Sequence, residues 1–399
     1  MSVDPAVLRA GLAVVERRAR QLTTYFYAHL FAHHPELRRL FPADLDEQRD
    51  RLFAALTRVV GRLEEPERLA GYLSSLGRDH RKFGVRPEHY PAVGASLLAA
   101  LRHSSGHAWT AADEKAWGQA WTVISEAMTA AAAAVPADTP PWWQAEVVQR
   151  RRAAPDVAVL TLAPDRGYPY TAGQYLTLCS PRVPQVWRPY SIACAPRPDG
   201  TLDLHVRRVP GGLLSTALVH DTVVGEQLRI GPPLGDAVLD RTSRRPLLAV
   251  AGGTGWGQIK ALLEQLGRDG GRPATVVLGA RDEADRYDLA DLRELVGRSP
   301  WLEVLLAVPA DGSGRAEAVD LLLDGLEGLG DCSGRDVLLS GPPNLAVDVT
   351  DLLLALGAEP DLIRHDPVPH TFDRRRPLTA PEWFLADRDI AWINRTELA

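Results

Sequence analysis

The sequence predicts a multidomain protein with three folds in series: an all-α domain, an antiparallel β-barrel and an α/β domain built on a parallel sheet. The chain has 399 residues, which is more than a single hydrophobic core usually serves. Its apolar periodicity changes from helical spacing to short β-rich runs, and then to alternating strands and helices. A proline-rich stretch around residue 136 separates the first two patterns.

The first segment contains helical periodicity only. Asp4 followed by Pro5 is typical of a helix start, and apolar residues from Leu8 to Leu30 recur at spacings of three and four, which predicts one long amphipathic helix. We therefore predict an all-α bundle over residues 1–136 and a linker over 137–144. Further apolar stripes occur over residues 52–63, 69–76, 93–101 and 117–128.

The second segment consists of β-rich runs separated by proline and glycine turns, which predicts an antiparallel barrel over residues 145–242. The runs cover residues 157–162, 174–178, 202–209 and 226–230. From residue 243 to 369, apolar strands alternate with amphipathic helices, and this alternation predicts a parallel sheet covered on both faces. Residues 370–399 show no clear periodicity and are predicted to form a C-terminal extension.

Composition excludes several classes of function. The chain carries 45 Lys and Arg against 51 Asp and Glu, without a basic block, so nucleic acid is not an expected partner. Three cysteines fit a reducing compartment better than a disulfide framework. The N-terminus has no apolar signal region and no run of about 18 apolar residues occurs, so we predict a cytoplasmic protein without an integral membrane segment.

Three polar residues occupy positions that the helical stripes assign to the interior: Gln48, His80 and Tyr90. Buried polar groups need partners. A histidine at the end of a helix is more often a hydrogen-bonded imidazole than a metal ligand. Taken alone, His80 therefore leaves both interpretations open.

A wider pattern surrounds these residues, with Tyr-Phe-Tyr at 25–27, Asp-His-Arg-Lys-Phe at 79–83 and Arg-Pro-Glu-His-Tyr at 86–90. It resembles the globin domain of bacterial flavohaemoglobins over essentially its full length. The resemblance implies a haem b with His80 as proximal iron ligand and Phe41 against the porphyrin. It further implies a distal pocket lined by Tyr27, Gln48 and Leu52.

The proximal side departs from the family. In the family, a glutamate and a tyrosine together hydrogen-bond the proximal histidine, and Tyr90 matches that tyrosine. The place of that glutamate falls on Ala132. A weaker effect on the iron is expected, because outer partners tune the basicity of a ligand.

Two segments of the predicted barrel resemble the FAD-binding segments of ferredoxin-reductase-like domains. The first is Arg188-Pro-Tyr-Ser191, and the second is the glycine turn that begins at Gly211. The resemblance implies that Arg188, Tyr190 and Ser191 bind FAD through its phosphate and its ring. It implies that the backbone of Gly211, Gly212 and Ser215 approaches the pyrophosphate.

Two further turns point to NADH or NADPH. Gly252, Gly253, Thr254 and Gly255 stand between a strand and a helix, where backbone N–H groups attract phosphate. This turn resembles the nicotinamide-binding turn of the same reductases, although Trp256 follows in place of a small apolar residue. Ser340 with Gly341 and Pro342 resembles the family's Cys-Gly-Pro segment, with a serine in place of the thiol. Plain glycine turns remain an alternative for both.

The order of the three domains resembles flavohaemoglobins over about residues 5–367. It implies an oxidoreductase that passes electrons from NAD(P)H through FAD to haem and converts nitric oxide and O2 to nitrate. One alternative is a flavohaemoprotein acting on another acceptor or on a hydroxy acid, and another is an oxygen-binding or sensing globin. Phe372, Trp383 and Phe384 of the extension either cover the flavin or belong to a surface tail. Arg281 either meets the 2′-phosphate of NADPH or is an ordinary exposed arginine, so the choice between NADH and NADPH stays open.

Overall fold

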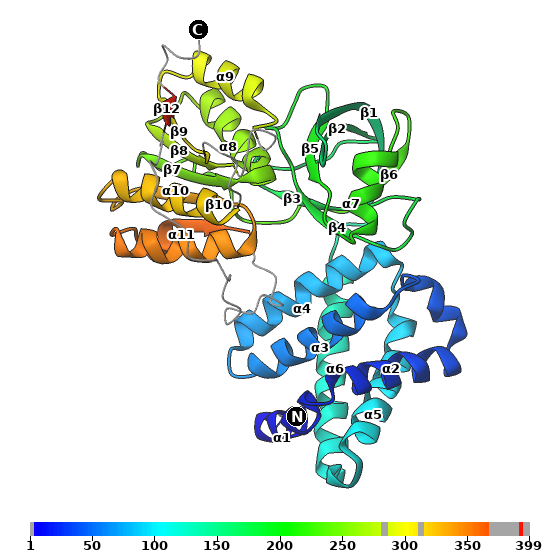
Figure 1. The fold of residues 1–399 in the computed structure, drawn as a ribbon. Coiled ribbons are helices and arrows are strands. Elements are labelled where there is room, and N and C mark those ends of the chain that lie inside the picture. Colours follow the sequence, from blue (N-terminus) through cyan, green and yellow to red (C-terminus); the bar gives the residue numbers. More distant parts are fainter. Residues whose placement is uncertain (1–3, 281–285, 310–314, 367–390, 394–399) are drawn as a thin grey trace. The chain divides into compact units, whose positions relative to one another are not determined.

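The computed structural model describes residues 4–280, 286–309, 315–366 and 391–393. Contacts divide the chain into two compact units, residues 1–142 and 143–399. The first unit is helical, and the second contains two sheets (Figure 1). In the part that is described, no helix is long and apolar enough to cross a membrane.

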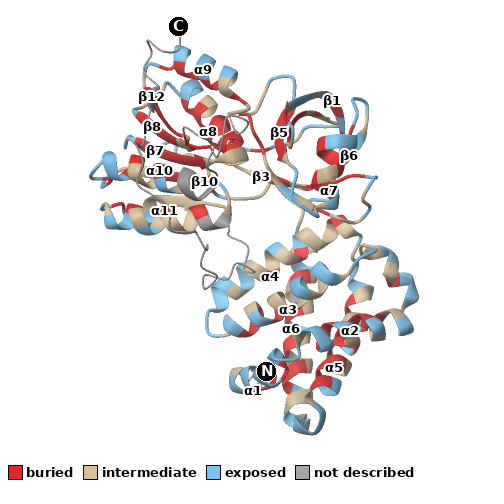
Figure 2. Cartoon of the chain, in the orientation of Figure 1, coloured by how far each residue is buried: buried red, intermediate tan, exposed pale blue. Residues whose placement is uncertain are grey.

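Six α-helices build the first unit, and their buried faces form its core (Figure 2). The predicted long helix over residues 8–30 is wrong, because the chain breaks at Arg17 and Arg18. The backbone of Arg18 leaves helical geometry, and its guanidinium donates to the Ser104 carbonyl at 3.0 Å. The helices are α1 (Pro5–Glu16), α2 (Ala19–His33), α3 (Asp46–Gly61), α4 (Pro66–His80), α5 (Tyr90–Ser105) and α6 (Ala111–Ala133).

Glycines let α6 approach its neighbours closely. A Cβ on Gly77 of α4 would lie 2.2 Å from the backbone oxygen of Met128, and one on Gly94 of α5 would lie 2.2 Å from the Trp121 ring. These approaches tolerate no side chain. The crossing at Gly77 fixes the last turn of α4, which ends at His80.

The first sheet of the second unit is antiparallel, in the order β4-β3-β6-β1-β2-β5. A bridge between Ile192 and Leu204 joins its two edges, so the sheet closes into a barrel around an apolar core. A short helix, α7 (Leu213–Thr216), follows β5. The strands are β1 (Trp143–Ala154), β2 (Val157–Pro164), β3 (Tyr175–Cys179), β4 (Arg188–Ser191), β5 (Leu202–Arg207) and β6 (Gln227–Ile230).

The second sheet has the order β11-β10-β7-β8-β9-β12, in which β12 alone among the described strands runs antiparallel to its neighbour. The predicted extension 370–399 thus supplies an edge strand, whereas its residues Phe372, Trp383 and Phe384 lie outside the described residues. The strands are β7 (Leu247–Gly252), β8 (Ala274–Gly279), β9 (Leu302–Ala307), β10 (Asp336–Ser340), β11 (Ile363–His365) and β12 (Ala391–Ile393).

Helices cover both faces of this sheet, each over its own apolar cluster (Figure 1). One face carries α8 (Trp256–Arg268) and α9 (Leu289–Arg298), and the other carries α10 (Arg315–Gly328) and α11 (Pro343–Ala355). From β7 the chain moves outward to β8 and β9 on one side, and later returns to β10 on the other. The carboxyl ends of β7 and β10 therefore flank a topological switch point, where open α/β sheets bind ligands.

Candidate functional site

His80 is a half-buried imidazole whose tautomer is fixed by its neighbour. Its Nδ1 lies 2.7 Å from the backbone oxygen of Leu76. A carbonyl can only accept, so Nδ1 donates its proton and the lone pair resides on Nε2. Burial lowers the pKa of His80 and so favours the neutral ring. A neutral imidazole with a backbone-bonded Nδ1 is the form that binds iron, so this residue fits a haem.

The residues predicted for the distal pocket lie together between α2 and α3. The ring of Tyr27 stands edge-on to Phe41, with 5.6 Å between centroids, and its hydroxyl donates to the Gln48 carbonyl at 3.3 Å. Burial raises the pKa of Tyr27 well above its usual value, which keeps the hydroxyl a proton donor. Leu52 packs on the same apolar cluster. The structure thus joins one phenol donor to an apolar and aromatic wall.

Tyr90 lies in the apolar cluster that also contains Leu73 and Leu76 of α4. Its carbonyl accepts from Trp121 Nε1 at 3.1 Å, and burial raises the pKa of its hydroxyl. The carbonyl of Leu76 accepts the hydrogen bond from His80. Tyr90 therefore shares an apolar cluster with the residue that bonds to His80. Ala132 is half-buried in the last turn of α6.

The residues predicted to bind flavin lie on β4, an edge of the hydrogen-bonded order of the barrel. Tyr190 is paired with Leu176 and Ser191 with Tyr175. The guanidinium of Arg188 donates to the Trp187 carbonyl at 3.0 Å, and burial raises the pKa of Tyr190. Arg188 and Tyr190 occupy alternate positions of β4, and Ser191 follows directly after Tyr190. A cation, a flat phenol and a hydroxyl suit a phosphate-bearing aromatic ring system.

The turn at Gly211 and Gly212 needs both glycines. Gly211 has a φ of 75°, and a Cβ on Gly212 would lie 2.7 Å from Ser215 Oγ. That hydroxyl accepts from the Val209 N–H at 3.0 Å and donates to the Gly212 carbonyl at 3.2 Å. Ser215 therefore holds the turn whose bare backbone faces outward.

The two predicted nicotinamide segments meet at the switch point. A Cβ on Gly255 would lie 2.3 Å from the Ser340 carbonyl oxygen, and one on Gly252 would lie 2.5 Å from a Leu345 methyl. Gly341 packs in turn against the backbone of Gly252, while Pro342 precedes α11. Thr254 lies between these glycines, in the turn that opens α8. This backbone cradle fits a dinucleotide diphosphate at a helix N-terminus.

Comparison with known proteins agrees with this arrangement. A globin family model matches residues 24–128, and an oxidoreductase FAD-binding domain model matches residues 144–238. A flavohemoprotein of Chromobacterium violaceum is 27% identical over 90% of this chain and 96% of its own length. One of Deinococcus radiodurans is 29% identical over 87% and 92%.

The solved structure of a flavohemoglobin from Malassezia yamatoensis, with bound FAD and heme, superposes with a TM-score of 0.74 at 20% identity, over 92% of this chain and 98% of that one. The chain is similar to flavohemoproteins over most of its length. The predicted fold class is thereby confirmed, and the predicted family agrees with these relatives. The two family models show a globin joined to an oxidoreductase FAD-binding domain.

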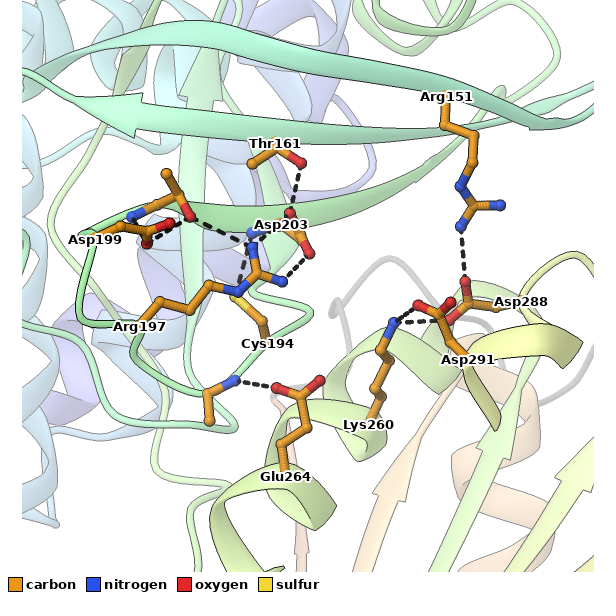
Figure 3. Close-up of polar contacts among 12 residues, drawn as sticks. Arg151, Thr161, Cys194, Arg197, Asp199, Asp203, Lys260, Glu264, Asp288 and Asp291 are labelled. Carbon is orange, nitrogen blue, oxygen red and sulfur yellow. Dashed lines mark hydrogen bonds and ion pairs between the residues drawn. The ribbon is translucent and has the colours of Figure 1, made fainter. Parts of the chain in front are cut away.

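A buried polar network in the second unit was not predicted from the sequence. Asp288, which is 5% exposed, accepts from Trp256 Nε1 at 3.0 Å, Lys260 Nζ at 3.1 Å and Arg151 Nη2 at 2.8 Å. Figure 3 shows Arg151 descending from the barrel toward this carboxylate, with Asp291 completing the set around Lys260. Burial opposes the charge of Asp288, but His205 and then Lys260 hold the pKa of the carboxyl below its usual value. The network explains Trp256, because its indole anchors the first turn of α8.

The rest of α8 also docks on the flavin barrel. Glu264 accepts from the Ala195 backbone N–H at 2.9 Å (Figure 3), and Gln258 donates to the Gly173 carbonyl at 2.6 Å. Gln258 donates as well to Asp366 at 2.9 Å, and burial raises the pKa of Asp366 to about 6. The glycine turn at the start of α8 is thus held at a set position on the barrel.

His205 is the buried imidazole at this junction. Its Nδ1 lies 2.8 Å from the Tyr287 hydroxyl, and a Cβ on Gly257 would lie 3.0 Å from the same nitrogen. Burial lowers the pKa of His205 to about 4, although the Asp288 carboxylate favours the charged ring. The sequence signal for this residue was weak: strand alternation places it on the outer face of the barrel, and only the neighbouring α8 buries it.

We predict that His205 makes the fold of the second unit sensitive to acid. Its ring titrates near 6.5 when unfolded and near 4 when folded. Between these values the unfolded chain binds a proton that the folded chain does not, so the free energy of unfolding falls as pH drops through this window, by up to about 3 kcal/mol. Urea denaturation followed by flavin fluorescence measures the effect.

The control is His205→Gln, which keeps a polar side chain that does not titrate. The other charged groups near His205, namely Asp203, Asp288, Lys260 and Arg151, are present in both proteins. Wild type is expected to lose more stability than the variant between pH 6.5 and 4. Parallel pH profiles for the two proteins would contradict the assignment.

Proposed function

We propose that this protein is a flavohaemoglobin that acts as an NAD(P)H-dependent nitric oxide dioxygenase and converts nitric oxide and O2 to nitrate. The observation that carries the proposal is a combination within one chain. A globin unit holds a half-buried histidine whose Nδ1 is bonded to a backbone carbonyl, and a reductase unit joins a flavin-type strand to a nicotinamide-type glycine cradle. When bound, the cofactors supply the electron transfer and the oxygen chemistry.

On the globin side, His80 Nε2 is the proposed iron ligand and Tyr90 is its neighbour on the proximal side. Tyr27 and Gln48 are the proposed hydrogen-bond donors that orient O2, with Phe41 and Leu52 as the apolar wall. Burial of the Tyr27 hydroxyl among aromatic rings supports this role, because a donor excluded from water acts more strongly on a ligand.

On the reductase side, Arg188, Tyr190 and Ser191 are proposed to hold FAD together with the Gly211–Gly212 turn. The backbone of Gly252 to Gly255 is proposed to cradle the dinucleotide diphosphate, and Gly341 with Pro342 forms the opposite wall. Docking of α8 on the barrel supports this assignment, because the two cofactors must come within roughly 3 to 3.5 Å of each other to react.

The same reasoning gives the proposed domain boundaries. The globin domain is assigned to residues 1–136, the linker to 137–144, and the FAD domain to 145–242. The nicotinamide domain is assigned to residues 243–369 and the extension to 370–399. Two sheets with separate apolar cores support the division of the reductase.

A second candidate function is reduction of another acceptor, or oxidation of an organic hydroxy acid, by the same electron chain. Ala132 and Ser340 favour it, because the family has a carboxylate and a thiol at these places. Without the carboxylate on α6, His80 receives less electronic support for oxygen chemistry.

Stopped-flow consumption of nitric oxide by the air-equilibrated, NADH-reduced protein tests the proposal. We expect rapid nitric oxide loss, with nitrate formed in equal amount and NADH oxidised in step. Tyr27→Phe serves as the variant that removes the proposed donor and should slow nitric oxide consumption while NADH-driven flavin reduction is kept. Steady NADH oxidation without nitric oxide loss would favour the second candidate.

A further inference from the structure

Arg207 is the last residue of β5, and its side chain lies at the glycine turn that opens α8. Strand alternation places it on the same outer face as His205, which approaches Gly257 in the first turn of α8. A Cβ built on Gly253 would lie 4.0 Å from Arg207 Nε, and among the described residues no other atom beyond the chain neighbours of Gly253 lies within 4 Å of it. The guanidinium therefore borders the open space in front of this turn.

A carboxylate of the barrel holds the Arg207 guanidinium in place. Arg207 Nη1 donates to Asp156, in the turn between β1 and β2, at 2.7 Å. The side chains of Arg207 and Asp156 are 19% and 32% exposed, so the pair is partly shielded from water. A guanidinium presents its N–H donors in a planar fork, so it can keep this carboxylate and donate to a second anion as well. Arg207 is thus a positive charge at a set place beside the turn.

We propose that Arg207 binds the diphosphate of the nicotinamide dinucleotide from the flavin barrel, together with the backbone of the Gly252–Gly255 turn. This inference rests on the nicotinamide-binding function proposed above. The diphosphate is an anion, whereas the backbone N–H groups of the turn carry no net charge. A guanidinium at the same opening supplies that charge, because its fork matches phosphate oxygens and its hydrogen bonds to an ionised group are stronger than neutral ones.

The Asp156 carboxylate separates this proposal from a purely structural role of Arg207. If Arg207 served only to pair with Asp156, removing either partner would have the same effect on the protein. If Arg207 binds the diphosphate, removing the charge of Asp156 should keep or tighten ligand binding. The reason is that a negative charge near the ligand is lost while the guanidinium stays.

Titration calorimetry with ADP-ribose on the full chain, loaded with FAD and haem, tests the proposal. ADP-ribose carries the diphosphate without the nicotinamide, so its binding needs no contact with the flavin. We expect Arg207→Gln to bind ADP-ribose at least about tenfold more weakly than wild type, because a charged hydrogen-bond donor is lost. Asp156→Asn should bind at least as tightly as wild type. Arg208→Gln, which changes the exposed next residue, is the matched control and should bind as wild type.

Salt dependence gives a second measurement. The affinity of wild type for ADP-ribose should fall as ionic strength rises, and the fall should be smaller in Arg207→Gln, because salt screens the attraction between the guanidinium and the diphosphate. Flavin absorbance gives the FAD content of each variant, and circular dichroism checks that it is folded.

Equal ADP-ribose affinity in wild type and Arg207→Gln would overturn the inference while leaving the nicotinamide turn in place. Equal weakening in Arg207→Gln and Asp156→Asn would also overturn it, because the two residues would then act only as a structural pair. Loss of FAD from Arg207→Gln with unchanged ADP-ribose affinity would overturn it by assigning the guanidinium to the flavin. Failure of wild type itself to bind ADP-ribose would contradict the proposed function, and the inference with it.

Discussion

Replacing His80 with alanine is expected to remove the protein ligand of the haem iron. The ring is held by the Leu76 carbonyl at 2.7 Å, which leaves Nε2 as the base. Alanine offers no substitute, so the purified variant should hold at least about tenfold less haem than wild type. Haem extraction and the ferrous-CO absorption spectrum measure the loss.

Added imidazole should restore part of the binding, because it fits the space that the side chain leaves. His89→Gln is the matched control: that imidazole lies on the same connection and accepts from the Arg86 N–H at 3.2 Å, so its loss should leave haem content unchanged. An unaltered ferrous-CO spectrum in His80→Ala would show that another residue binds the iron.

Gly255→Ala is expected to block reduction of the flavin by NADH. The new Cβ would lie 2.3 Å from the Ser340 carbonyl oxygen and 2.8 Å from the Gly341 nitrogen. Both contacts are backbone, so no rotamer change relieves them, and the turn must shift. A displacement of about 1 Å costs on the order of a hundredfold in rate. Stopped-flow flavin absorbance under anaerobic conditions follows the reaction.

Gly297→Ala is the control, because nothing lies within 4 Å of a Cβ at that position of α9. Bound FAD and CO binding after dithionite reduction should be normal in both variants, which separates a blocked nicotinamide turn from a misfolded reductase. Wild-type reduction rates in Gly255→Ala would remove this turn from the electron path.

Local patterns were sufficient for most elements. Apolar spacing predicted the stripes of α3 to α6 and the alternation of β7 to α11, because a segment must bury one face whatever its neighbours are. Patterning failed between Leu8 and Leu30, where the apolar spacing continues through a break. At that break Arg18 donates to the carbonyl of Ser104, a residue 86 positions away, and such a contact has no local signal in the sequence.

The sequence by itself determined the fold class, and it indicated the family and the residues now proposed for the cofactor sites. These depend on short segments whose geometry is local, such as a glycine turn after a strand or a histidine at the end of a helix. It also placed Gln48, His80 and Tyr90 among residues that need partners, because they interrupt apolar stripes.

Only the tertiary structure decided how the reductase is held together. Asp288 collects donors from β1 and α8, and His205 becomes buried only when α8 covers the outer face of β5. Charge pairing and desolvation depend on distance in space. Residues more than a hundred positions apart, such as Arg151 and Asp288, carry no local signal of their contact, so folding alone brings them together.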